Sequence, residues 1–195
     1  LVTFGDPQVS SASKLTRFKN EAVPGIKTHI TELSKSVPCY GITLGDIISN
    51  SNSSNSGAYR DDMRDGFAKS KIGLPVFQVM GNHDNTHYNS SKPVYADERN
   101  SSFELKAQRE HEEMFGPVNY FHIIGMRYIV YTTNLSSSSY VLGFLDSQWE
   151  WLKQDLALVP KDKAVVLCVH IPFYNKNSHH TQEALALLNT YKEAH

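Results

Sequence analysis

Four apolar runs along the chain share one layout. Each is a continuous apolar run rich in Val, Ile, Leu, Phe or Tyr, with polar residues toward its end; the four segments are 1–8, 37–48, 73–84 and 164–173. Continuous apolar runs are typical of strands that are buried on both faces, as in parallel sheets covered by helices. We therefore predict four strands that belong to an α/β fold.

The segments between these runs have helical character. Residues 15–36 and 60–70 mix charged residues with spaced apolar positions, and 146–159 has its apolar residues on one helical face. Residues 119–134 contain two β-like segments that meet at Gly125, which predicts a hairpin. Strands alternating with helices favour an α/β architecture with right-handed crossovers.

The end of the chain departs from this alternation. Residues 180–195 predict a helix that runs to the C-terminus, with no strand after it. Because a strand normally follows such a helix, we predict one domain over residues 1–195 that is C-terminally incomplete and lacks its last strand. The polar segments 48–72 and 85–118 contain loops beside strand ends, where substrates are often selected, but they indicate no substrate.

Composition narrows the function. The chain of 195 residues is 40% hydrophobic and has a net charge of −1, which suits one globular domain and gives no reason to expect nucleic acid as a partner. No apolar run reaches the ~20 residues needed to span a bilayer. Cys39 and Cys168 lie in apolar runs and are expected to be buried thiols. Because the chain begins at Leu1, additional domains and an exported or periplasmic parent protein are open alternatives to a cytoplasmic one.

The candidate chemistry lies where the predicted strands end. In α/β sheets ligands bind beyond the carboxyl ends of strands. Carboxylates, amides and imidazoles together suit Mn²⁺, Fe²⁺, Co²⁺ or Zn²⁺, and a central carboxylate can bridge two ions that hold a hydroxide and clamp a phosphate. A helix-capping role for the aspartates and a core position for the last histidine are the structural alternatives. The side chains at these ends are Asp6, Gln8, Asp46, Asn82, His83, Asp84 and His170.

The order DPQ, LGD, GNHD and VHIPF resembles the calcineurin-like metallophosphoesterase family, and 142–156 resembles the segment before that family's later histidine. The resemblance implies a four-layer αββα sandwich, in which two mixed sheets are flanked by helices. The sequence departs from the family pattern twice. Gln8 occupies the usual position of a histidine, and the closing Gly-His-x-His motif is absent.

The resemblance also implies a ligand set for two divalent ions, which would be Mn, Fe or Zn. Asp6 would bind the first ion and Asp46 would bridge both. Asn82 and His170 would bind the second ion, and Gln8 would stand at a ligand position with a neutral amide oxygen. The missing closing motif would remove one imidazole from each ion and weaken metal binding.

The implied reaction is hydrolysis of a small phosphate mono- or diester by a hydroxide held between the two ions. His83 would stabilise the developing charge and protonate the leaving oxygen, while Asp84 would orient His83 and hold its tautomer. The alternative is a non-catalytic binding scaffold of the same fold, which Gln8 and the missing motif favour. The intact GNHD argues for the enzyme, because a scaffold has no need of an imidazole backed by a carboxylate.

Overall fold

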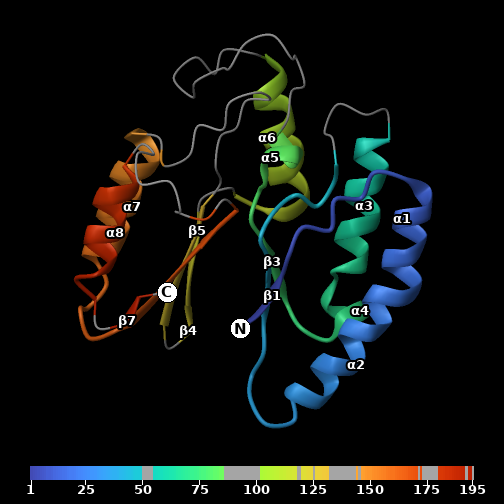
Figure 1. Cartoon of the computed structure of the whole chain (residues 1–195), viewed down its shortest axis with the longest axis horizontal. Coiled ribbons are helices and arrows are strands. Elements are labelled where there is room, and N and C mark those ends of the chain that lie inside the picture. Colours follow the sequence, from blue (N-terminus) through green and yellow to red (C-terminus); the bar gives the residue numbers. More distant parts are fainter. Residues whose placement is uncertain are drawn as a thin grey trace.

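The computed structural model of the protein describes residues 1–49, 55–85, 102–117, 120–124, 126–131, 144, 146–170, 172, 180–191 and 193–194. Two sheets form its frame (Figure 1). The first is wholly parallel in the order β1-β2-β3, formed by Val2–Phe4, Gly41–Thr43 and Val76–Gln78. The second has the order β4-β5-β6-β7, formed by Tyr120–Ile124, Met126–Tyr131, Ala164–Val169 and Glu193–Ala194.

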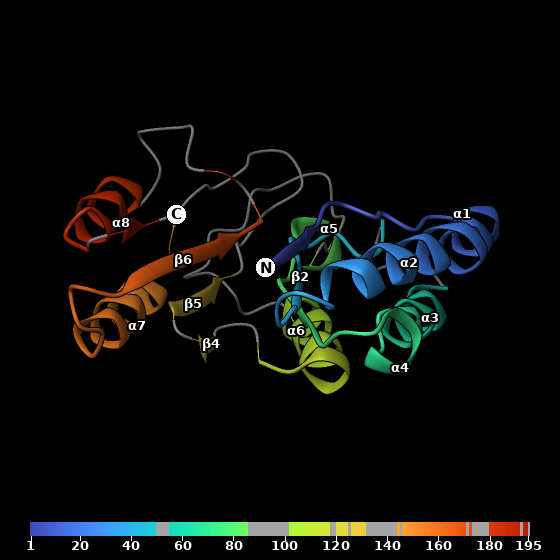
Figure 2. The same ribbon diagram turned by 90° about the horizontal axis from the view of Figure 1, so that it is seen from below.

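Helices cover the two sheets from opposite flanks (Figure 2). Against the first sheet pack α1 (Ala12–Arg17), the π-helical turn η1 (Phe18–Ala22), α2 (Val23–Leu33), α3 (Ser56–Gly66) and α4 (Lys69–Ile72). The second sheet is covered by α7 (Asp146–Ala157) and α8 (Thr181–Leu188). Each helical layer buries its apolar residues in a separate cluster against its own sheet, so apolar burial holds each layer in place.

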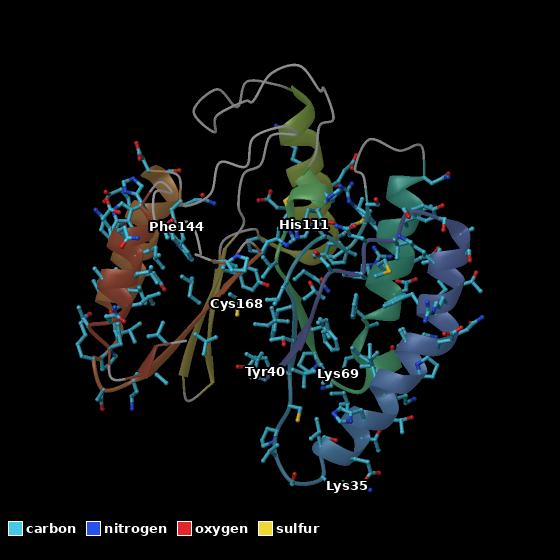
Figure 3. The ribbon with its side chains drawn as sticks, in the orientation of Figure 1. Lys35, Tyr40, Lys69, His111, Phe144 and Cys168 are labelled. Atoms are coloured by element: carbon cyan, nitrogen blue, oxygen red, sulfur yellow. The ribbon has the colours of Figure 1, made fainter. Side chains whose placement is uncertain are left out.

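A third apolar cluster joins the two sheets. Ile42 of β2 and Cys168 of β6 are buried in it together with Tyr40 and Val79, and Figure 3 shows Cys168 between the sheets. A hydrogen bond crosses the same interface, since the Tyr120 hydroxyl donates to the Gln78 carbonyl over 2.8 Å. The two sheets therefore meet at this cluster, and the carboxyl ends of β1, β2, β3 and β6 are available to form one site.

The structure confirms the main elements predicted from the sequence. The four apolar runs contain β1, β2, β3 and β6, and the predicted hairpin is the antiparallel pair β4–β5. Cys168 is buried as expected, whereas Cys39 is only half-buried, and both thiols are free. No described helix has both the length and the apolar character that a membrane crossing requires.

Three expectations about the fold are wrong. Among the strands that the structure describes, the second sheet is mixed but the first is not, because β1, β2 and β3 are all parallel. The segment 85–118, expected to be a loop, contains α6 (Ser102–Phe115); residues 86–101 lie outside the described part of the chain. The last helix ends at Leu188, and the strand β7 that was expected to be missing follows it and pairs in parallel with β6.

The early end of α8 has a local cause. The Thr190 hydroxyl and backbone N–H both turn back to the Leu187 carbonyl, which closes the helix. Tyr191 is then buried, and its hydroxyl donates to the Leu156 carbonyl of α7. This anchor directs the chain toward the free edge of β6, where β7 pairs.

Candidate metal centre

The ends of three strands bring a possible ligand group together. Asp6 follows β1, Asp46 follows β2 and His170 follows β6. One ligand atom from each of these residues lies within 4.8 Å of the other two. Asp6 is exposed, Asp46 is buried and His170 is partly buried, so the group opens to solvent on one side. Convergence of these three strand ends was predicted from the sequence and is observed.

Asp46 lies at the centre of the group and is almost fully buried. Its Oδ1 accepts a hydrogen bond from the backbone N–H of His83 over 2.8 Å, and its Oδ2 accepts one from the Gln8 amide over 3.0 Å. His170 Nε2 lies 3.3 Å from Oδ1. Burial acts to raise the pKa of Asp46, but His170 and these hydrogen bonds outweigh it, so the pKa of Asp46 is lowered.

Two glycines make room for this carboxylate. A Cβ on Gly81 would lie 2.2 Å from both the backbone nitrogen and Oδ1 of Asp46. Gly45 has a φ of 96°, and a Cβ there would lie 2.7 Å from the backbone of Gly81. Only residues without a side chain permit such a close approach of two backbone segments.

The backbone itself is strained at the centre. Gln8 and Asp46 have φ values of 39° and 52°, in the left-handed region that non-glycine residues rarely adopt. Such conformations cost about 1–3 kcal/mol each and cluster at functional sites. The strain at two neighbouring strand ends therefore supports a functional role for this turn.

His170 is oriented by the neighbouring strand. Its Nδ1 donates to the Leu44 carbonyl over 2.7 Å, which leaves Nε2 directed at Asp46. Burial acts to lower the pKa of His170, but the hydrogen bond and charge of Asp46 outweigh burial and raise it. With a proton on Nε2 the ring donates to Asp46, and a metal ion bound between these two atoms would replace that proton.

Asp6 completes the group at its exposed side. Its pKa is raised, first by partial burial and then by the negative charge of Asp46. Two carboxylates that raise each other's energy in this way, with an imidazole nitrogen beside them, are a donor set that fits a divalent cation of intermediate softness. The residues present therefore fit the metal that the sequence predicted.

His83 stands beside the group without joining it. Its Nδ1 donates to the Ser49 carbonyl over 2.6 Å, so in the neutral ring Nε2 has the lone pair. Nε2 lies 3.8 Å from Asp46 Oδ2, beyond hydrogen-bond distance, and the side chain is 25% exposed. The imidazole is thus partly open to solvent, next to the carboxylates.

Asp84 has a different role from the predicted one. Its Oδ1 accepts from the backbone N–H of Ile48 over 3.1 Å and its Oδ2 from that of Gly81 over 2.9 Å. The Ser49 carbonyl, not Asp84, fixes the tautomer of His83, so the prediction that Asp84 orients the imidazole is wrong. Asp84 is 1% exposed, and burial raises its pKa to about 6. Its carboxylate instead joins the ends of β2 and β3.

The family model for calcineurin-like phosphoesterase matches residues 5–194. The chain belongs to this family. No curated protein matches it. A phosphoesterase of this family is a metal-dependent hydrolase of phosphoester bonds, and the group formed by Asp6, Asp46 and His170 is the corresponding candidate metal site in this chain.

For two predicted ligands of the phosphoesterase, Gln8 and Asn82, the structure shows no contact between a side-chain oxygen and the candidate metal site among the described residues. Gln8 lies beside Asp46, but it is the amide nitrogen that contacts the carboxylate. Asn82 begins the short helix α5 (Asn82–Asn85), and its side chain lies outside the described residues. Their roles as metal ligands therefore stay predictions.

Sequence reasoning missed two buried side chains next to the phosphoesterase site. Arg60 of α3 is 1% exposed and donates from Nη2 to the Asp84 carbonyl over 2.8 Å. His111 of α6, labelled in Figure 3, is also 1% exposed. Among the described residues neither of its ring nitrogens has a hydrogen-bond partner. Burial, and then the charge of Arg60, lower the pKa of His111 to about 3. Both lie in polar segments of mixed charge, which give no local sign of burial.

Proposed function

We propose that this protein hydrolyses a small phosphate mono- or diester at a centre of two divalent metal ions, Mn, Fe or Zn. The observation that supports this most is the convergence of Asp6, Asp46 and His170 beside a histidine whose Nε2 faces the same carboxylate. A structural cluster would have no use for two strained strand ends and two glycines packed backbone to backbone.

In this proposal Asp6 and Gln8 would hold the first ion, Asp46 would be shared by both, and Asn82 and His170 would hold the second. When bound, the ions would supply Lewis acidity toward the phosphoryl oxygens and would activate water. The chain arranges the donors, with Leu44 fixing His170 and the backbone of His83 holding Asp46 in place.

His83 is the proposed general acid. Its Nδ1–H is engaged by Ser49, so a proton on Nε2 is the one available to the leaving oxygen of the ester. As the P–O bond breaks, that proton moves from Nε2 to the departing alkoxide or phenoxide. Asp84 contributes only by holding the backbone on which His83 is placed.

The finer architecture belongs to the same proposal. Three apolar clusters, one beneath each helical layer and one between the sheets, support a four-layer αββα sandwich. We infer that residues 1–195 act as a single domain, with the catalytic centre at one end of the sheet-to-sheet interface.

One observation favours the alternative of a non-catalytic scaffold. Gln8 donates its amide N–H to Asp46, so this carboxylate has a neutral partner where the family usually has an imidazole. In a chain that had lost its metals, this hydrogen bond would satisfy a buried carboxylate oxygen that would otherwise face an ion.

The two functions are separated by metal content and turnover. The protein is mixed with Mn²⁺, Fe²⁺ or Zn²⁺, desalted and assayed by elemental analysis, and turnover is measured with phenyl phosphate, p-nitrophenyl phosphate and bis-p-nitrophenyl phosphate. Close to two ions per chain with turnover supports the enzyme. Neither metal nor turnover with any ester supports the scaffold.

His83→Ala tests the mechanism. If His83 protonates the leaving group, kcat for phenyl phosphate falls by about 10²–10⁴-fold while the metal content is unchanged. His29→Ala is the matched control, because His29 is exposed on α2, and it should leave both quantities unchanged. Turnover of His83→Ala equal to that of the unmodified protein would remove this mechanism.

A further inference from the structure

Arg60 is a buried cation that joins the turn bearing His83 to two helices. Its Nη2 donates to the Asp84 carbonyl over 2.8 Å, and its Nη1 is ion-paired with Glu110 of α6. Arg60 is 1% exposed and the Glu110 side chain 31%. The guanidinium therefore links α3, α5 and α6 through two separate arms.

Burying a charge is unfavourable unless the charge is paired and hydrogen-bonded. Glu110 supplies the counter-charge of Arg60. The second contact of Arg60, to the Asp84 backbone carbonyl in α5, is not needed to neutralise the charge. Among the described residues Arg60 Nε has no partner, so the guanidinium is used only through its two terminal nitrogens. Lysine cannot reproduce this arrangement, because its single ammonium lacks the planar fork.

The Asp84 end of this link is continuous with His83. The Asp84 carboxylate is held by the backbone N–H groups of Ile48 and Gly81, and its carbonyl by Arg60. The preceding residue, His83, donates its own N–H to Asp46 Oδ1 over 2.8 Å. In the part of the chain that the structure describes, Arg60 therefore ties this turn to the helices, whereas Asp46, Ile48 and Ser49 tie it to the strand ends.

We propose that Arg60, held by Glu110, is a positioning residue that sets where His83 Nε2 lies relative to the phosphate leaving group. The inference rests on the proposed phosphoesterase reaction. Arg60 does not touch the candidate ligands; it acts through the Asp84 carbonyl on the backbone of its neighbour. A shift of about 1 Å in a proton donor lowers turnover far more than it lowers substrate binding.

Leaving-group dependence distinguishes positioning from general support of the fold. Phenolate needs a proton as it departs, whereas p-nitrophenolate leaves readily without one. A misplaced His83 should therefore lower the turnover of phenyl phosphate more than that of p-nitrophenyl phosphate. The variants are Arg60→Lys and Glu110→Gln, which keep the size of the side chains. Arg64→Lys is the control on the same helix, because Arg64 is 45% exposed and pairs with Asp61 and Asp65.

We expect both variants to lower kcat for phenyl phosphate about tenfold, and kcat for p-nitrophenyl phosphate no more than about twofold. KM and metal content should be unchanged, and Arg64→Lys should behave as the unmodified protein. An equal loss for both esters in the two variants would overturn the proposal, since it would indicate a merely structural role.

Amide hydrogen exchange on the metal-free protein gives a second measurement that needs no turnover. In Arg60→Lys and Glu110→Gln the His83 amide should exchange at least tenfold faster than in Arg64→Lys. If the unmodified protein hydrolyses none of the esters, the phosphoesterase proposal fails whatever the exchange shows. Unchanged exchange at His83 would overturn the positioning role alone.

Discussion

Gly81→Ala adds one methyl group at the tightest point of the candidate centre. The new Cβ would lie 2.2 Å from the Asp46 backbone nitrogen and Oδ1 and 2.9 Å from its Cγ, whereas ordinary contacts begin at 3.4 Å. The difference requires Asp46, or the strand end that bears Gly81, to move by about 1.2 Å. Neither side yields easily, because the atoms that the methyl group meets belong to the backbone and to a buried carboxylate.

Two consequences follow in different measurements. Overpacking of this kind costs about 1–3 kcal/mol in the free energy of unfolding. A displacement of about 1 Å at the proposed bridging ligand should lower turnover about 10²-fold and reduce the metal content below that of the unmodified protein. Thermal unfolding, elemental analysis and p-nitrophenyl phosphate turnover measure the three effects on one preparation.

Gly57→Ala is the matched control. A Cβ at Gly57, in α3, meets no atom within 4 Å, so alanine there should keep metal content and turnover and leave stability equal or slightly higher. If Gly81→Ala binds metal and turns over substrate like Gly57→Ala, Asp46 is not held at the centre by the close backbone approach, and our reasoning about this turn is refuted.

Two further predictions concern titrating groups. The pKa of His111 is near 6.5 in the unfolded chain and is lowered to about 3 in the folded protein. The unfolded state therefore binds one more proton below pH 6.5, and the free energy of unfolding decreases as the pH is lowered. Urea unfolding should therefore show that the stability lost between pH 8 and pH 5 is smaller by about 2 kcal/mol in His111→Phe than in the unmodified protein; equal losses would disprove a neutral, buried His111. In the metal-free protein Asp46→Asn should lower the pKa of His170, because Asp46 raises it more than the Leu44 carbonyl or Asp6 does, and an NMR titration of the ring that shows no fall would contradict this pairing.

The sequence predicted those parts of the site whose signals are local. Asp46 and His83 could be found because each follows a short apolar run that stops at or near a glycine, and parallel strands place such ends together. His170 was recognisable as an imidazole at the end of an apolar strand. To place these residues at one edge of the sheets, it is enough to know that the strands run in the same direction.

The parts that could not be predicted depend on distant partners. Arg60 and Glu110 lie fifty positions apart, and each is one charged residue among many on a polar helix, so their burial leaves no periodic pattern. The helix α6 was missed for the same reason, and β7 because a strand of two residues exists only by pairing with β6. The role of Asp84 was misjudged because one of its two backbone donors, Ile48, belongs to another strand end, and a contact between such distant residues leaves no local pattern.

The candidate ligands come from both sheets, since Asp6 and Asp46 follow strands of the first and His170 follows a strand of the second. Within the described part of the chain, the apolar cluster between the sheets consists of four buried residues with four partly buried ones packed against them. An ion held by Asp46 and His170 would thus be a cross-link between two halves that otherwise adhere through a small interface. By thermodynamic linkage the folded state would gain free energy with the logarithm of the free ion concentration. Metal supply would then govern whether the two halves unfold together or one after the other, which makes the centre a determinant of folding cooperativity as well as of chemistry.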